Sequence, residues 1–96
     1  MATVTHTIQH TRENTETPWV ELTESFQARI DHFKSTGDLI SFETVDHDEL
    51  TSTTTIVFAS EEAEQTVTND ADWLAFVNSI QADYAAKGFG YTENRT

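Results

Sequence analysis

The side chains best suited to chemistry in this sequence are two histidines near its start. His6 and His10 alternate with threonine and glutamine, so both are expected on one face of a β-strand. Residues four apart on a strand are separated by about 13 Å, which is too far to share one metal ion at about 2.0–2.1 Å per ligand. We therefore interpret them as separate sheet-face histidines and not as a shared metal site.

An acidic cluster is the second candidate. Asp46, His47, Asp48 and Glu49 have ligand types suited to a divalent cation, and their carboxylates favour calcium or magnesium. They lack the spacing and the glycine of an EF-hand calcium loop. Aspartate also stabilises chain reversals by bonding the backbone, so we interpret the cluster as a solvated turn and predict no metal site.

Catalytic motifs are not recognisable in the chain. It has no cysteine and only three glycines, which excludes a cysteine nucleophile, a thiolate metal site and a glycine-rich phosphate loop. No serine, histidine and aspartate arrangement can be argued from spacing. The sequence therefore predicts neither a catalytic residue nor a cofactor.

A set of aromatic side chains, with one histidine, has two interpretations. The first is that the aromatics are simply the hydrophobic core, because a chain of 96 residues has few others from which to build one. The second is that the set lines a pocket between helices and sheet. The candidate lining residues are His6, Trp19, Phe26, Phe42, Trp73 and Tyr84.

Length and charge limit the classes of function. A chain of this length makes one domain, residues 1–96. Seventeen acidic residues against five basic ones give a net charge of −12, so direct binding to nucleic acid or to an anionic membrane is not expected. The same charge suits a basic partner or an imitation of DNA. The N-terminus lacks the parts of a signal peptide, and no segment approaches the apolar length of about 18 residues that spans a bilayer.

The elements that position these side chains follow from apolar spacing. Residues 4–10 alternate as a strand. A helix is predicted to begin at Thr17-Pro18, because threonine caps a helix and proline suits its first turn, and to end at Gly37. Its apolar stripe consists of Trp19, Leu22, Phe26, Ile30 and Phe33.

Residues 39–58 form a predicted hairpin around which the rest of the chain is organised. Its two strands alternate apolar and polar side chains, and the reversal falls in the acidic cluster. The residues expected on its apolar face are Ile40, Phe42, Ile56 and Phe58.

The second half of the chain is predicted to be helical and then extended. Ser60 begins a short helical turn with glutamates at its start, and Asp70 caps a helix over residues 71–87 that stops at Gly88. Residues 89–92 form a weak last strand, and residues 93–96 are expected to fray. This order predicts an α+β ferredoxin-like split βαβ fold (β-α-β-β-α-β), in which two helices cover one face of an antiparallel sheet.

Such a sheet leaves its other face and its edges for a partner. Alternate strand residues would form a flat, uncharged patch on the open face, comprising Thr3, Thr5, Thr7, Thr53 and Thr55. Contact between two such patches escapes the repulsion between acidic surfaces. We therefore predict a homodimer or docking on a larger assembly.

The element order and the segment FASEEA, residues 58–63, resemble the dimeric α/β-barrel domains that include small antibiotic-biosynthesis-type monooxygenases. The resemblance is one of architecture and covers the whole chain. It implies a cofactor-free oxygenase or ligand-binding protein, with an aromatic and polar pocket between helices and sheet.

Three segments are also similar to small uncharacterised proteins of contractile-tailed marine cyanophages. They are THTIQHTRENTETPW at 5–19, SFETVDHDELTSTTTIVF at 41–58 and DYAAKGF at 83–89. This resemblance implies a phage protein located in the virion or in the host cytoplasm. It carries over no functional residues.

The leading hypothesis from the sequence is a non-enzymatic phage-type interaction or structural protein. It would dimerise, or dock on a larger viral or host assembly, through its sheet face or edge. The alternatives are a small monooxygenase-like or ligand-binding dimeric α/β-barrel protein, and an acidic DNA mimic that inhibits a host protein. A cavity of roughly several hundred Å³ between helices and sheet would favour the ligand-binding alternative.

Overall fold

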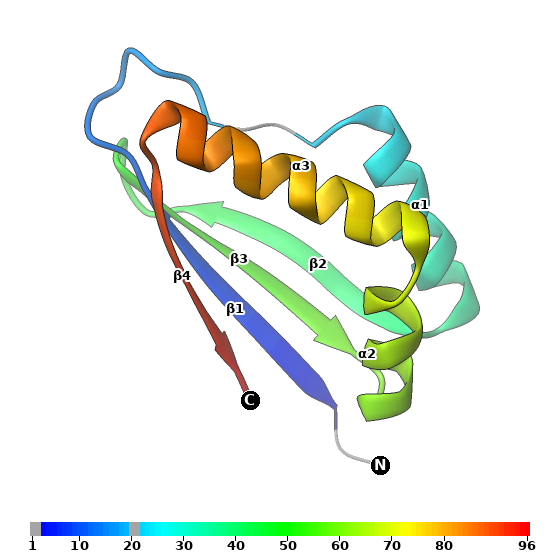
Figure 1. The fold of residues 1–96 in the computed structure, drawn as a ribbon. Coiled ribbons are helices and arrows are strands. Elements are labelled where there is room, and N and C mark those ends of the chain that lie inside the picture. The colour runs from blue at the N-terminus through cyan, green and yellow to red at the C-terminus, as the bar shows by residue number, and fades with distance from the viewer. Residues whose placement is uncertain (1–2, 20–21) are drawn as a thin grey trace.

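The computed structural model describes residues 3–19 and 22–96, and it consists of one sheet covered on one side by helices (Figure 1). The elements in chain order are β1 (Val4–Thr11), α1 (Glu24–Thr36), β2 (Leu39–Asp46), β3 (Thr51–Phe58), α2 (Glu61–Thr68), α3 (Ala71–Lys87) and β4 (Gly90–Arg95). The predicted α+β ferredoxin-like fold is confirmed. The short helical turn predicted after the hairpin is the separate helix α2.

The sheet has the strand order β2-β3-β1-β4, and all neighbouring strands are antiparallel. β3 therefore lies between β1 and β2, which is the split βαβ arrangement. In the β1–β3 ladder Val4 lies opposite Phe58, and His6 lies opposite Ile56. These four side chains face the helices, because alternate residues of a strand point to opposite sides.

The start of β2 departs from the predicted alternation. Its register with β3 shifts between Leu39 and Ser41, as a β-bulge does when one extra residue enters a strand. Leu39 is buried and Phe42 still packs against the core, but Ile40 is 54% exposed. The prediction that Ile40 faces inward is therefore wrong.

The first helix begins later than the sequence pattern indicated. α1 starts at Glu24, and the Thr23 Oγ1 accepts a hydrogen bond of 3.1 Å from the backbone N–H of Phe26. The predicted start at Thr17-Pro18 is wrong. There, the side chain of Asn14 accepts bonds from the backbone N–H groups of Glu16 and Thr17, which stabilises a turn in place of a helix.

The other predicted helix boundaries are confirmed. The side chains of Ser60 and Asp70 accept bonds from backbone N–H groups in the first turns of α2 and α3. Gly37 and Gly88 end α1 and α3 with φ values of 85° and 73°, which glycine adopts without steric cost. No helix within residues 3–19 and 22–96 is long and apolar enough to cross a membrane.

The last strand is longer than predicted. β4 pairs with β1 as far as Arg95, which lies opposite His6. The backbones of Thr96 and Thr5 also exchange two hydrogen bonds of 2.9 Å. The prediction that residues 93–96 fray is wrong, because these residues complete the edge of the sheet.

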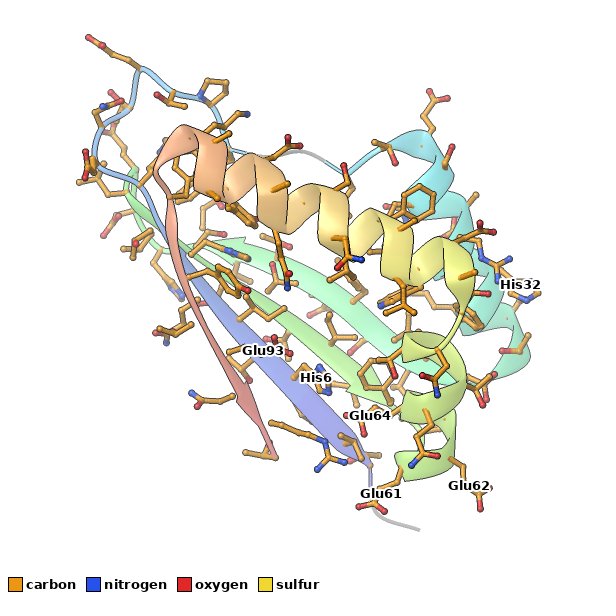
Figure 2. The ribbon with its side chains drawn as sticks, viewed as in Figure 1. His6, His32, Glu61, Glu62, Glu64 and Glu93 are labelled. Carbon is orange, nitrogen blue, oxygen red and sulfur yellow. The ribbon has the colours of Figure 1, made fainter. Side chains whose placement is uncertain are left out.

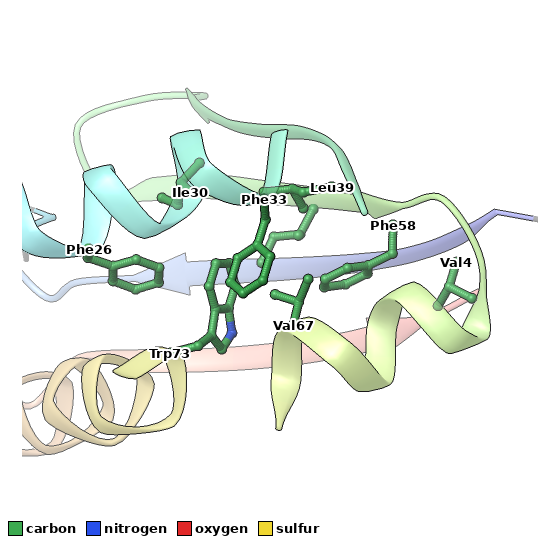
Figure 3. Close-up of a cluster of buried hydrophobic side chains, with 9 residues drawn as sticks. Val4, Phe26, Ile30, Phe33, Leu39, Phe58, Val67 and Trp73 are labelled. Carbon is green, nitrogen blue, oxygen red and sulfur yellow. The ribbon is translucent and has the colours of Figure 1, made fainter. Parts of the chain in front are cut away.

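The hydrophobic core lies between the helices and the sheet (Figure 3). Aromatic rings meet edge to face in it: Trp73 of α3 lies 4.9 Å from Phe26 and 6.0 Å from Phe33 of α1, measured between ring centroids. This geometry adds to the stabilisation from burial. The buried cluster consists of Val4, Phe26, Ile30, Phe33, Leu39, Ile56, Phe58, Val67 and Trp73.

The position of the α1 cap can be tested with two matched substitutions. Thr23→Ala removes the hydroxyl that caps α1, so we expect the free energy of unfolding to fall by about 1 kcal/mol. Thr17→Ala is the control, since Thr17 lies outside the helix, and it should change stability by less than about 0.5 kcal/mol. Urea denaturation measures both. A larger loss for Thr17→Ala than for Thr23→Ala would contradict the observed start of the helix.

Candidate functional site

A cavity of about 450 Å³ lies between the helices and the inner face of the sheet. Its wall is formed by all four strands, by α1 and α3, and by residues at the end of α2 and before α1. The lining includes each residue predicted for a pocket: His6, Trp19, Phe26, Phe42, Trp73 and Tyr84. Phe26 and Trp73 belong to the buried cluster and also face the cavity.

Most of the cavity wall is apolar. Ile8 of β1 and Val77 and Ile80 of α3 are half-buried and pack against the core. Leu22 and Leu74 also line the cavity and remain exposed. The cavity is therefore open to solvent at its rim, and an apolar molecule can reach it without unfolding of the core.

One end of the cavity is polar. His10, Ser52 and Thr54 lie on the inner sheet face and are almost fully buried, with His10 only 7% exposed. The His10 Nε2 lies 3.2 Å from the Thr54 Oγ1, which lies 3.0 Å from the Thr44 Oγ1. His10, Thr54 and Thr44 form a row across three strands, and we name this row the polar row. The His10 Nδ1 at its buried end has no hydrogen-bond partner among the described residues.

The electrostatics of this end keep its groups neutral. Burial lowers the pKa of His10 below its ordinary value, and burial raises the pKa of Tyr84. The two rings are stacked with their centroids 4.8 Å apart. At neutral pH His10 is therefore an uncharged imidazole beside an uncharged phenol.

A charged network closes the cavity between β1, β4 and α2. Figure 2 shows His6 lying between Glu64 and Glu93. Its Nε2 contacts Glu64, and its Nδ1 lies 3.0 Å from the Glu93 Oε1. Arg95 donates two hydrogen bonds of 2.8 Å to the two carboxylate oxygens of Glu64. Both ring nitrogens of His6 thus face carboxylates, so His6 forms part of the cavity wall through its ring.

The buried Glu64 carboxylate is the centre of this network. Hydrogen bonds from Arg95, and then from His6, outweigh the effect of burial and lower the pKa of Glu64 to about 2. This role was not predicted from the sequence, where Glu64 was interpreted as one of the charges at the start of a helix. Its α-helical phase gave one signal, since Glu64 lies one residue after Ala63 and three before Val67, and both of these face the core.

The acidic cluster of the β2–β3 reversal has a structural role. The Asp48 Oδ1 accepts bonds of 2.7 and 2.8 Å from the backbone N–H groups of Leu50 and Thr51. These bonds lower the pKa of Asp48. His47 contacts the hydroxyl of Thr53 through its Nε2 at 2.6 Å. Within the described ranges, no group of three or more histidine, aspartate and glutamate side chains is placed to hold a metal ion.

The predicted threonine patch lies on the sheet face opposite the helices. Thr7 is directly opposite Thr55 in the central β1–β3 ladder, and Thr5 and Thr53 lie opposite Val57 and Gln9. Thr3 precedes β1 and is exposed. The structure therefore brings the predicted patch residues to one face, and we call this surface the open face.

The carboxylates do not gather on a single surface. The described acidic residues occur in the loops on both sides of α1, on the outer side of α1, at the β2–β3 turn, at the start of α2, along α3 and on both edge strands. An imitation of DNA needs negative charges spaced along one face in the manner of phosphates. This distribution gives the DNA-mimic alternative no structural support.

Solved structures of other proteins have a similar fold. The sequence matches no protein-family model and no curated protein. Among solved structures, a variant of SnoaB, a cofactor-independent oxygenase from Streptomyces nogalater, superimposes with a TM-score of 0.66 at 10% identity, covering 98% of this chain and 90% of that one.

Two further structures are similar. A conserved Bacteroides thetaiotaomicron protein of unknown function, described as a possible oxidoreductase, has a TM-score of 0.58 at 9% identity, with 98% and 95% of the chains covered. A dabb family protein with a ferredoxin-like fold from Mesorhizobium loti has a TM-score of 0.54 at 13% identity, with 98% and 94% covered. The chain thus has the ferredoxin-like fold of dimeric α/β-barrel proteins, as the architectural resemblance implied.

The Glu64 network makes stability depend on pH. The folded pKa of about 2 lies below the ordinary value of 4.5, so the stabilisation is present above about pH 4.5 and is lost as pH falls towards 2. We expect Glu64→Gln to lower the free energy of unfolding by about 2 kcal/mol at pH 7. The difference from the unsubstituted protein should shrink steadily between pH 5 and pH 2, which are rough bounds set by the two pKa values.

Glu62→Gln is the matched control, because Glu62 lies on the same helix and points away from the sheet (Figure 2). Its effect should stay within about 0.5 kcal/mol at every pH. Denaturant titrations at a series of pH values measure both variants. A Glu64→Gln effect that is the same at low and neutral pH would show that Glu64 does not act through its charge.

Proposed function

We propose that this chain binds a small, largely apolar organic molecule in the cavity between its helices and sheet. The observation that supports the proposal most strongly is the cavity itself. Its volume of about 450 Å³ falls within the range of roughly 300–1,000 Å³ typical of ligand pockets. Aromatic and aliphatic walls with a few convergent polar groups are also typical of such sites.

The apolar wall of this open cavity is the surface that a ligand would cover. Atoms that face the cavity lack the dispersion contacts that a packed interior supplies. The rings of Phe26, Phe42 and Trp73 pack against one another and also line the cavity, so the atoms that face it lack such contacts. A ligand would restore those contacts.

Oxygenase chemistry is the enzymatic form of this proposal. A protein described as a cofactor-independent oxygenase shares the fold, and the residues predicted for a pocket line the cavity in this chain. The activity to assay first is therefore oxygen consumption in the presence of aromatic molecules that bind. Ligand binding without turnover remains the simpler form of the same function.

We also propose that two copies associate through the open face. That face carries threonine hydroxyls on its two central strands, whereas the chain as a whole has a charge of −12. Glu43 is a carboxylate on this face, opposite Thr55 in the β2–β3 ladder. A second copy supplies an equally neutral surface, so contact here avoids most of the charge repulsion. The ligand cavity lies on the other side of the sheet, so both proposals hold together.

We also propose that the chain docks on a larger viral or host assembly. The similarity to cyanophage proteins predicts a partner in the virion or in the host cytoplasm, and the open face or the sheet edges are the surfaces that would dock. Mass spectrometry of purified virions tests this location. High copy number in the particle supports a structural part, and absence supports a role in the infected cell.

Ligand binding can be tested by filling the cavity. Val77→Phe adds a ring to the α3 wall and should lower the affinity for neutral one- to three-ring aromatic compounds at least about tenfold, because the added atoms occupy the ligand volume. Quenching of Trp19 and Trp73 fluorescence, with ligand-observed NMR, measures binding. Ala82→Phe, on an exposed position of the same helix, is the control and should bind as the unsubstituted chain does. Failure of every such compound to bind the unsubstituted chain would refute the proposed function.

Self-association can be tested by adding charge to the open face. Thr55→Glu places a carboxylate beside Glu43 and, in a dimer, near the partner's surface, so we expect the dimer dissociation constant to rise at least about tenfold. Thr66→Glu adds the same charge on the exposed side of α2 and should leave the constant within about threefold. Sedimentation equilibrium measures both. A monomer at all concentrations, or equal effects of the two substitutions, would exclude the open face as the interface.

A further inference from the structure

The polar row lies on the inner sheet face, which elsewhere packs apolar side chains against the helices. His10, Thr54 and Thr44 come from β1, β3 and β2, and all three line the cavity. The row runs from buried His10 to exposed Thr44. Burying polar groups against apolar neighbours is costly unless they are hydrogen-bonded. A sheet face that served only as core would carry apolar residues at the buried positions of His10 and Thr54.

The hydrogen bonds within the row do not satisfy its members. A neutral imidazole and two hydroxyls carry three donor protons, whereas two contacts, at 3.2 and 3.0 Å, join the three side chains. One proton is therefore left over within the row. The unpartnered Nδ1 at the buried end favours a proton on Nε2, because a buried N–H without an acceptor is the rarer arrangement. The donors then run from His10 through Thr54 to Thr44.

The end of the row defines what a ligand must offer. The Thr44 hydroxyl is left to donate at the exposed edge of β2, beside the aromatic wall formed by Phe42. The Thr44 and Thr54 oxygens keep unused lone pairs. A group that both accepts and donates matches this edge, and the neutral state of His10 at the other end leaves no full charge to pair with an ion.

Resting on the ligand-binding function proposed above, we propose that the polar row selects a neutral, planar aromatic ligand that carries a hydroxyl group at its edge. The rings lie between α3 and the sheet among the aromatic side chains, and the hydroxyl bonds to Thr44 and Thr54. Asp46 and Glu93 line the cavity. Their carboxylates repel anionic ligands and so exclude them.

A matched pair of compounds tests the selection. 2-Naphthol and 2-methylnaphthalene have nearly the same shape and differ by a hydroxyl in place of a methyl group. A wholly apolar pocket would prefer the methyl compound, whose transfer from water is more favourable. The polar row should reverse this order and bind 2-naphthol about tenfold more tightly, since the methyl compound leaves the row unpaired. Fluorescence titration and isothermal calorimetry measure both constants.

Three substitutions locate the preference. Thr54→Val removes the central hydroxyl and keeps the shape, and Thr44→Val does the same at the exposed end, where folding is least at risk. Both should abolish the preference for 2-naphthol and leave binding of 2-methylnaphthalene within about threefold. Thr66→Val removes a hydroxyl from the exposed side of α2 and should change neither constant.

The possible outcomes separate the two proposals. A preference for 2-naphthol that Thr44→Val removes supports the polar row as the selecting element. Equal binding, or tighter binding of 2-methylnaphthalene, overturns the selection and leaves the ligand-binding function standing. Binding of neither compound overturns the selection, and the ligand-binding function is overturned as well if every other neutral one- to three-ring aromatic compound also fails to bind. A preference that survives Thr44→Val and Thr54→Val places the selecting group elsewhere and contradicts the proposal.

Discussion

Strict alternation along the two central strands is the constraint on which the rest of this structure depends. In β1 and β3, every second side chain lies on the open face and is polar except for Val57, and the residues between them face the helices. A slip of one residue in the pairing would bury the threonines and expose Val4 and Phe58. The same alternation places His6 and His10 on the inner face, one beside a charged network and the other beside a cavity.

The inner face is itself divided along its length. Around Phe58 it meets α1 and α2 in a close-packed core, and Trp73 connects this core to α3. Towards His10 the helices and the sheet enclose a cavity, and the sheet there carries hydroxyl groups and an imidazole. The core stabilises the fold, and the cavity next to it is available to a ligand. The open face remains free for another chain.

Much of the architecture follows from local patterns. Period-two alternation predicted the strands, and the cap residues Ser60 and Asp70 with Gly37 and Gly88 predicted most helix ends. The predicted start of α1 was wrong because the apolar stripe continues through Trp19 and Leu22, which both precede the helix and line the cavity. Periodicity reports which side chains share a face, and it does not report where the backbone begins to turn.

The site was only partly predictable for a related reason. The candidate aromatics could be chosen from spacing, and they line the cavity. The bonds that give the site its polarity join distant segments, as Glu64 joins Arg95 and as His10 joins Thr54. Thr54 differs from Thr53 and Thr55 only in strand phase, so its inward direction followed from the predicted alternation. Its bond to His10 could not be predicted, because it depends on the register of β1 and β3.

The central claim is that the space between α3 and the sheet is a ligand site. Nuclear Overhauser effects between bound 2-naphthol and the methyl groups of the chain test this claim most directly. We expect contacts to Ile8, Ile56 and Val77, which line the cavity. Contacts confined to the exposed Ile40 and Val45 would place the molecule on the outside of the protein and contradict it.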